Sequence, residues 1–212
     1  MGRVLLVDQD CPQRDVLHEA ERMLVAGGVL VMPTDSVYGI GCAATPGNPG
    51  HGRIFDIKLR DRAQTLPWLV ADPSDLSTYG AGLPDYAIRL AVSFWPGALT
   101  LVVNASDAVP QEYRGADGTI ALRMPDSNLV RELSRLAGAP LATTSANTHG
   151  EAAATSGSSV EARIVEEADL TLDAGPAPVG VASTIVSLVG KEPKVLREGA
   201  IPAHQIIKIA DV

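Results

Sequence analysis

The fold is decided by Pro33-Thr34-Asp35-Ser36-Val37-Tyr38-Gly39-Ile40-Gly41, which follows the apolar run Val29-Leu30-Val31-Met32. The apolar run predicts a buried strand, and the residues after it predict a break into a Gly-x-Gly turn that carries small polar side chains. Open α/β sheets bind ligands outside such strand ends, and glycine lets a backbone approach closely. An ordinary connection that uses Gly and Asp for its turn geometry would explain this stretch if it stood alone.

Length and composition predict a single domain over residues 1–212. The hydrophobic fraction is 46%, with 4% aromatic residues, and a chain of this length buries a substantial core. The apolar run in residues 1–8 is too short for a secretory signal, and no stretch reaches the ~18 to 20 apolar residues of a membrane span. Cys11 and Cys42 form no metal or redox pattern, and the 4 histidines are scattered. We therefore expect a cytoplasmic protein with no membrane contact and no structural metal site.

The charge pattern favours a small anionic ligand. A formal net charge of −8 argues against a protein that coats nucleic acid non-specifically. The positive charge is nevertheless concentrated, because Arg53, Lys58, Arg60 and Arg62 fall within ten residues. A basic cluster on an acidic protein indicates a small anion more often than a long polyanion. The alternative is a solvated charged helix face followed by a loop.

Helical and strand patterns alternate without a strict βαβ rhythm. This predicts an α/β fold in which helices pack on a mixed, twisted sheet. The expected helices cover 12–26, 83–94, 127–136, 158–168 and 202–209, with another ending at residue 58. The expected strands cover 3–7, 29–32, 68–70, 99–103, 119–123, 141–143, 184–188 and 195–196. We interpret 142–159, rich in Ala, Ser, Thr and Gly, as a long loop on the ligand side.

Further polar clusters interrupt the predicted strands. Arg123 ends one strand and could hold a carboxylate or phosphate bidentately. The segment 143–147 offers hydroxyls, an amide and free backbone N–H groups, which suit phosphate oxygens. Ser183 opens a later strand, and Arg197 ends the last. Each cluster alone could be a helix cap or a surface ion pair, but together they favour a nucleotide-like ligand.

Seven segments in order resemble the signatures of the Sua5/YciO/YrdC family. They are 33–41, 53–60 (RIFDIKLR), 94–100 (FWPGALT), 122–125 (LRMP), 145–147 (SAN), 183–186 (STIV) and 196–199 (LREG). The resemblance runs from about residue 29 to residue 199. It implies a three-layer fold of the YrdC/RibB type, with a concave basic cavity on a twisted sheet.

The resemblance also implies an activity. Members of the family synthesise L-threonylcarbamoyladenylate from L-threonine, bicarbonate and ATP, with release of pyrophosphate and with a Mg²⁺ ion expected on the ATP. The product feeds the threonylcarbamoyl modification of adenosine 37 in tRNA. Because other tRNA-modification proteins carry out the transfer, weak or no direct binding of tRNA is expected of this chain.

Residue roles carry over by motif. The resemblance implies that the threonine site contains Thr34, Tyr38, Arg123, Thr143 and Ser183. It implies that the ATP site contains Lys58, Arg60, Thr119, Ser145, Asn147 and Arg197. Lys58 and Arg60 would be the catalytic residues, because they would neutralise the charge that develops on the phosphates. No protein nucleophile and no metal ligand is implied.

The chain departs from the family pattern at three places. The segment between Lys58 and Pro67 has two additional residues and no proline after Arg60, so a competing alignment puts Arg60 and Arg62 at the basic positions. Ala71 stands where many members have a histidine, and Ser187 where they have an aspartate. These departures leave two alternatives open. One is a YciO-like enzyme with a different acceptor amino acid, and the other is a non-catalytic nucleotide- or RNA-binding module.

Overall fold

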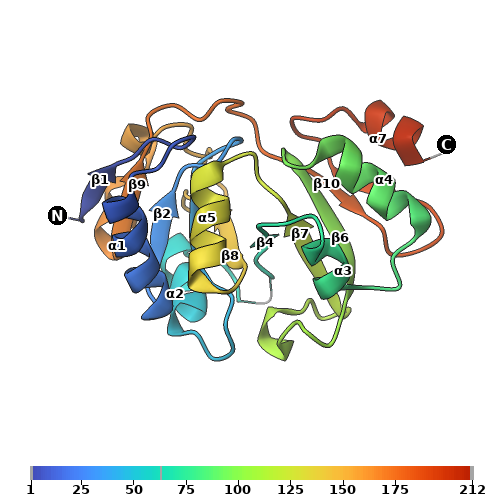
Figure 1. Ribbon diagram of the computed structural model, residues 1–212, viewed down its shortest axis with the longest axis horizontal. Helices are drawn as coiled ribbons and strands as arrows, with labels where there is room; N and C mark the ends of the chain where they lie inside the picture. Colours follow the sequence, from blue (N-terminus) through green and yellow to red (C-terminus); the bar gives the residue numbers. More distant parts are fainter. Residues whose placement is uncertain (1, 63, 211–212) are drawn as a thin grey trace.

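The computed structural model describes residues 2–62 and 64–210 and contains one mixed sheet flanked by helices (Figure 1). The strand order is β1-β9-β2-β3-β8-β4-β7-β6-β10-β11. The short strand β5 stands outside this order and pairs with β6. The strands are β1 (Val4–Leu6), β2 (Leu30–Met32), β3 (Gly39–Ala43), β4 (Trp68–Leu69), β5 (Gly80–Ala81), β6 (Leu99–Ala105), β7 (Thr119–Arg123), β8 (Leu141–Ser145), β9 (Leu170–Asp173), β10 (Thr184–Ser187) and β11 (Lys194–Arg197). The predicted α/β class with a mixed sheet is confirmed.

The helices cover both faces of this sheet because successive strand residues point to opposite faces. Leu30 and Met32 pack with residues of α1 and α5, whereas Val29 and Val31 belong to a separate cluster with residues of α2 and α6. The helices are α1 (Arg14–Val25), α2 (Pro49–Lys58), α3 (Asp75–Tyr79), α4 (Asp85–Phe94), α5 (Asn128–Ala137), α6 (Ala162–Glu167) and α7 (Ala203–Ala210), with short 3-10 turns at Gln111–Tyr113 and Gly157–Ser159. The three layers are therefore helices, sheet and helices.

The opening stretch differs from its prediction in one respect. Gly39 and Gly41 do not form a turn but lie in β3, which pairs antiparallel with both β2 and β8. The reversal is made instead by residues 33–38. Both positions need glycine because of a close neighbour. A Cβ atom at either one would come within 3.0 Å of the side chain of Thr143. The prediction that these glycines permit a close approach is confirmed, although the approaching group is a strand of the same sheet.

Two further expectations need correction. The helix expected over 158–168 is shorter, since 157–159 forms a 3-10 turn and α6 begins at Ala162 after Val160 and Glu161 in extended backbone. The strand expected over 141–143 extends to Ser145, because β8 has β3 as a partner along its whole length. Strand β9 was not expected from the sequence, and neither was α3 or β5.

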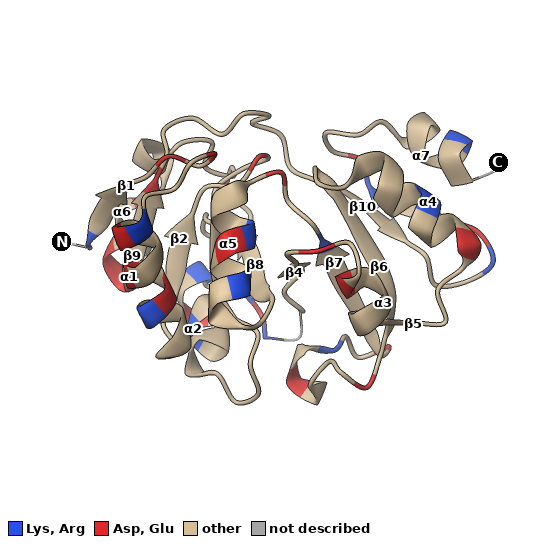
Figure 2. Ribbon diagram, in the orientation of Figure 1, with Lys and Arg blue, Asp and Glu red and all other residues tan. Residues whose placement is uncertain are grey.

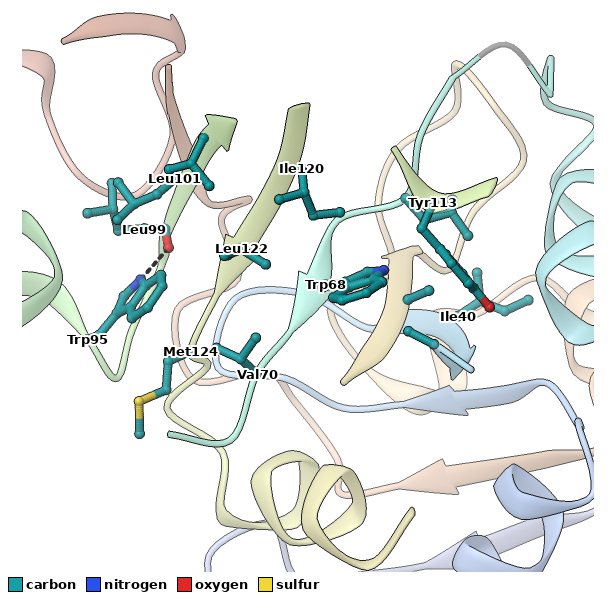
Figure 3. Packing of buried hydrophobic residues seen from close by; sticks show 14 of the residues in the cluster. Ile40, Trp68, Val70, Trp95, Leu99, Leu101, Tyr113, Ile120, Leu122 and Met124 are labelled. Atoms are coloured by element: carbon teal, nitrogen blue, oxygen red, sulfur yellow. Dashed lines mark hydrogen bonds between the residues drawn. The ribbon is translucent and has the colours of Figure 1, made fainter. Parts of the chain in front are cut away.

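The core at the centre of the sheet is built from large side chains of β4, β6 and β7 (Figure 3). Trp68 is 1% exposed and lies edge-on to Tyr113, with ring centroids 5.4 Å apart. Trp95 closes α4, and its indole N–H donates to the Leu99 carbonyl at 2.7 Å. This packing fixes β6 and β7, which carry Thr100 and Arg123, in one position relative to each other.

The outer surface carries mixed charge. Acidic and basic side chains are interspersed on α1 and α5 (Figure 2), and several form ion pairs such as Arg135–Glu132 at 2.6 Å. Among the described residues, no helix is long and apolar enough to cross a membrane.

Candidate functional site

A cavity of about 470 Å³ lies where the polar strand ends meet. It is lined by segments from both halves of the sheet, and hydroxyl groups and arginines dominate its polar lining. The hydroxyl-bearing residues are Thr34, Ser36, Tyr38, Thr65, Thr100, Thr143, Thr144, Ser145 and Ser183, and the arginines are Arg60, Arg123 and Arg197. With Asn147 and Glu151 also present, this composition suits an anionic, hydroxyl-rich ligand.

The structure brings together all the residues predicted for the site except Lys58 and Thr119, which do not line the cavity. Thr119 begins β7, and its hydroxyl donates to the Asp117 carboxylate at 2.7 Å. Lys58 ends α2 and lies behind the cavity wall. The binding roles assigned to these residues stay predictions.

The 33–38 connection is held by its own side chains. The Thr34 hydroxyl donates to the Val37 carbonyl at 2.8 Å and accepts from the Ser36 N–H at 3.2 Å. The Tyr38 hydroxyl donates to the Gly175 carbonyl at 2.7 Å, and burial raises the pKa of Tyr38 to about 12. Tyr38 is therefore neutral at physiological pH, and its hydroxyl is already engaged by the chain.

Arg123 is the buried cation of the cavity, with 7% of its side chain exposed. Its Nε–H donates to the Gly97 carbonyl at 3.0 Å, and Nη1 donates to the Ser36 hydroxyl at 2.8 Å. Nη2 donates to the Asp35 carboxylate, which is itself buried. These three acceptors fix the plane of the guanidinium, so that it presents a fixed fork to a ligand.

Arg60 reaches the cavity from the loop after α2. Its Nη1 donates to the Thr144 hydroxyl at 3.0 Å and its Nε–H to the Gln64 side chain at 2.7 Å. Burial lowers the pKa of Arg60, although a guanidinium stays charged at neutral pH. Arg62 instead pairs with Asp56 at 2.7 Å on the surface, with 63% of its side chain exposed. This geometry favours Lys58 and Arg60, rather than Arg60 and Arg62, as the basic pair.

Lys58 is 2% exposed and supports the turn that follows β8. Its ammonium donates to the Ser145 carbonyl and, at 2.6 Å, to the Asn147 carbonyl. Its own carbonyl accepts from the His149 N–H at 2.9 Å. Burial and the nearby Arg60 charge lower the pKa of Lys58 to about 8. Lys58 thus fixes the backbone that presents Ser145 and Asn147 to the cavity.

The backbone hydrogen bonds of this turn differ from those expected from the sequence. The sequence predicted free backbone N–H groups in 143–147, but the Ala146 N–H donates to the Tyr38 carbonyl at 2.8 Å and the Asn147 N–H to the Ser145 carbonyl at 3.0 Å. The Thr143 N–H donates to the Pro67 carbonyl at 2.8 Å. Most of the segment's donors are consumed because 141–145 is a strand. Its side chains are also partly engaged, because the Asn147 amide donates to the Glu151 carbonyl at 2.7 Å and the Thr143 hydroxyl to the Leu141 carbonyl at 3.0 Å.

The opposite wall is formed by β6, β10 and β11. The hydroxyls of Thr100 and Ser183 are 2.9 Å apart, and both residues are buried. Arg197 Nη2 donates to the Ser183 carbonyl at 2.8 Å, which holds this exposed side chain across the end of β10. The wall therefore places a cation beside two hydroxyl groups.

Several lining residues were not singled out as site residues from the sequence. Thr100 lies in the 94–100 segment and Ser36 in the opening stretch. Both segments resemble family signatures, but no binding role was predicted for either residue. Asp35 contacts Arg123 without lining the cavity, and no site role was predicted for it because a carboxylate is unexpected in a site that binds anions. Glu151 falls in the predicted ligand-side loop, and no pattern distinguishes it from other surface acids.

Residues 22–199 match the sequence profile of the Sua5/YciO/YrdC group, described as "Telomere recombination". The chain belongs to the Sua5/YciO/YrdC family. Over 183 residues it is 34% identical to the threonylcarbamoyl-AMP synthase of Pyrococcus abyssi, and the aligned region covers 86% of this chain and 54% of that protein. It is 35% identical over 187 residues to a putative threonylcarbamoyl-AMP synthase of Mycobacterium tuberculosis, covering 88% of this chain and 85% of the relative. The chain thus spans about half the length of the Pyrococcus relative.

Solved structures of the Sua5/YciO/YrdC family share this fold. The P. abyssi Sua5 structure complexed with L-threonine superposes with a TM-score of 0.88 at 31% identity, covering 97% of this chain and 60% of that one. Escherichia coli YciO superposes with a TM-score of 0.87 at 27% identity. The superposition covers 98% of this chain and 100% of YciO. The expected family and its three-layer fold are confirmed.

Two of the three departures from the family pattern are at residues that do not line the cavity. Ala71 follows β4, where its N–H donates to the Asp75 carboxylate at 3.1 Å and its carbonyl accepts from Arg135 at 3.0 Å. Ser187 ends β10, and its hydroxyl accepts from the Val189 N–H at 3.3 Å. Neither residue is among the described residues that line the cavity.

Proposed function

We propose that this protein is an L-threonylcarbamoyladenylate synthase, which forms threonylcarbamoyl-AMP and pyrophosphate from L-threonine, bicarbonate and ATP. The observation that carries the proposal is the convergence of side chains from separate motifs on one cavity. Arg60, Ser145, Asn147 and Arg197 come from three segments of the chain, 53–60, 145–147 and 196–199, and line the same space. The relatives named as synthases support the same activity. The product would serve proteins that modify tRNA, and this chain need not bind tRNA itself.

The threonine site is proposed around Arg123. A buried guanidinium with fixed orientation binds a carboxylate through two parallel hydrogen bonds. Thr143 and Ser183 are buried hydroxyl residues on two sides of the same cavity. The connection at Thr34 and Tyr38 would shape the wall next to the substrate, because the hydroxyls of these two residues already bond to the chain. The crystal structure of the P. abyssi relative complexed with L-threonine supports this amino acid.

The ATP phosphates are proposed to lie against the remaining cations. The threonine amine adds to carbon dioxide with loss of a proton, or condenses with bicarbonate with loss of water. The resulting N-carboxylate attacks the α-phosphorus of ATP, and pyrophosphate leaves. Arg60 and Arg197 would neutralise charge on the phosphates, and Ser145 and Asn147 would orient them. Lys58 would act from behind the wall by holding the turn at Ser145. A role for Thr119 would require the nucleotide to extend beyond the described cavity.

A magnesium ion is proposed to enter with ATP. Among the described residues, no group of three or more His, Cys, Asp or Glu side chains could hold a metal ion, and Glu151 is the carboxylate in the lining. Mg²⁺ is commonly held by substrate phosphates, waters and one or two carboxylates, rather than by an all-protein cage. The residues fit a metal delivered on the nucleotide, where it would neutralise phosphate charge.

The proposal is tested by measuring pyrophosphate release from ATP and bicarbonate, with and without L-threonine. Serine and the other amino acids serve as competing acceptors. Threonine-dependent release is the expected result. Binding of ATP without turnover of any amino acid would contradict the proposal and favour a non-catalytic nucleotide-binding module.

A second candidate is a YciO-like enzyme that uses another acceptor. The specific observation is that E. coli YciO superposes almost as well as P. abyssi Sua5, with TM-scores of 0.87 and 0.88. Pyrophosphate release with an amino acid other than threonine would favour this candidate.

A further inference from the structure

Asp35 and Arg123 form a buried ion pair at the cavity. Their side chains are 6% and 7% exposed. Arg123 lines the cavity, whereas Asp35 is not among the described lining residues. The carboxylate therefore contacts the guanidinium from outside the cavity lining.

Arg123 keeps donors for a ligand despite this pairing. A guanidinium has five N–H groups, and within residues 2–62 and 64–210 three of them have acceptors on Gly97, Ser36 and Asp35. This leaves one N–H on each terminal nitrogen. Two such groups are what a carboxylate needs for bidentate binding.

We propose that Asp35 is a positioning residue that sets the affinity of the site for the carboxylate of the amino-acid substrate. It does so by holding the Arg123 guanidinium in place and by offsetting its charge. The inference rests on the proposed function, which puts that carboxylate on Arg123.

The charge argument follows from burial. A charge that loses its partner in a buried site stays uncompensated, and electrostatic attraction is stronger there than in water. Without the Asp35 charge, Arg123 would hold an incoming carboxylate more tightly. With it, a substrate carboxylate meets a guanidinium already neutralised in part, so binding is weaker and readily reversible.

Asp35 also belongs to the connection that forms the cavity wall. Its carbonyl accepts from the Val179 N–H at 2.8 Å, which ties the 33–38 connection to the segment leading to Ser183. An asparagine at position 35 keeps the backbone contact and an oxygen for Arg123, while it removes the charge. Asp35→Asn therefore separates the charge from the geometry.

The test compares Asp35→Asn with wild type by calorimetric binding of L-threonine and of L-threoninol, which lacks the carboxylate. We expect the variant to bind L-threonine about tenfold more tightly and to bind L-threoninol as wild type does. In the pyrophosphate assay, KM for L-threonine falls while kcat changes less. Asp56→Asn is the matched control, because it removes a carboxylate from the exposed Asp56–Arg62 pair and is expected to change neither affinity.

Equal or weaker threonine binding by Asp35→Asn would overturn the inference while leaving the proposed function in place. Tighter binding of both ligands would also overturn it, since the gain would then not depend on the carboxylate. A wild-type protein that binds no L-threonine would overturn both. If Asp35→Asn does not fold, Asp35→Ser tests the same expectation, because its smaller side chain leaves room for water beside Arg123.

Discussion

The side chain of Thr143 lies against the backbone of Gly41, where a Cβ atom would come within 2.5 Å of the Thr143 hydroxyl oxygen. The two residues are register partners in the β3–β8 ladder, so neither can move without disturbing the sheet. Because Thr143 lines the cavity, the absence of a side chain at position 41 determines where its hydroxyl can be.

Gly41→Ala is expected to lower the free energy of unfolding by about 1–3 kcal/mol through overpacking. The clash also displaces Thr143, so KM for the amino acid should rise. Urea denaturation and steady-state kinetics measure the two effects. Gly52→Ala is the control, since the nearest atom there belongs to the flexible Arg62 side chain at 3.2 Å and alanine is favoured over glycine in a helix. A stable Gly41→Ala variant with unchanged KM would contradict this reading of the contact.

Lys58→Met is expected to lower ATP turnover by about a hundredfold without unfolding the protein, because small displacements of positioning groups carry costs of this size. The variant removes the ammonium that holds the Ser145 and Asn147 carbonyls. Turnover measured beside the circular dichroism spectrum separates loss of activity from loss of fold. Full turnover in a folded variant would contradict the positioning role of Lys58.

The pH dependence of turnover should follow Lys58. Burial, with Arg60 nearby, lowers its pKa to about 8, so the ammonium is charged below this pH and neutral above it. A neutral amine has one donor fewer, so turnover is expected to decline as the pH rises through about 8. Arg60 and Glu161, the charged groups that act on Lys58, keep their charges over this range. The alkaline decline should be missing from the residual activity of Lys58→Met, and its persistence there would assign it to another group.

Native protein should expose one reactive thiol. Cys11 is exposed and Cys42 is buried, and burial raises the pKa of the Cys42 thiol to about 12. Because the thiolate is the reactive form, a disulfide reagent such as DTNB should titrate Cys11 alone before denaturation and both cysteines after it. Rapid modification of two thiols in the native protein would contradict the burial of Cys42.

Tyr38→Phe is expected to destabilise the protein by about 1 kcal/mol, since it leaves two partly buried backbone groups without their hydrogen-bond partner. The lost hydroxyl accepts from the Ala174 N–H at 3.0 Å and donates to the Gly175 carbonyl at 2.7 Å. Tyr86→Phe is the matched control, because the buried Tyr86 hydroxyl has no partner among the described residues. Equal effects of the two substitutions in thermal unfolding would contradict the assigned role of the Tyr38 hydroxyl.

Local patterns in the sequence predicted much of the framework. Helix α5 shows why, since Ser127 caps its first turn by accepting from the Val130 N–H at 3.3 Å, and Gly138 ends it at φ 65°. Such boundaries depend on neighbouring residues, and neighbouring residues are visible in a sequence. Strand β9 is different, because four residues become a strand through parallel pairing with β1 and β2 far away in the chain.

The sequence predicted which residues would form the site better than it predicted how their side chains would be arranged. Arg123 and Ser183 were selected from their places at strand ends, and both line the cavity. Lys58 was selected as part of a basic cluster, yet its ammonium is turned toward backbone carbonyls because α2 ends beside the turn after β8. Asp35 could not be selected, since its importance depends on an arginine 88 positions later.

The position of β9 between β1 and β2 has a consequence for synthesis on the ribosome. Residues 4–6 pair in parallel with 171–173, and Leu30 and Val31 pair with Leu170 and Thr171 on the other side. Strand β1 therefore leaves the exit tunnel long before its partner, which is made more than 160 residues later. Contacts so distant in sequence form slowly, and strands that await partners are open to wrong pairing with other nascent chains. Strand β2 can pair early with β3, so β1 is the strand that most needs protection while the chain is being made.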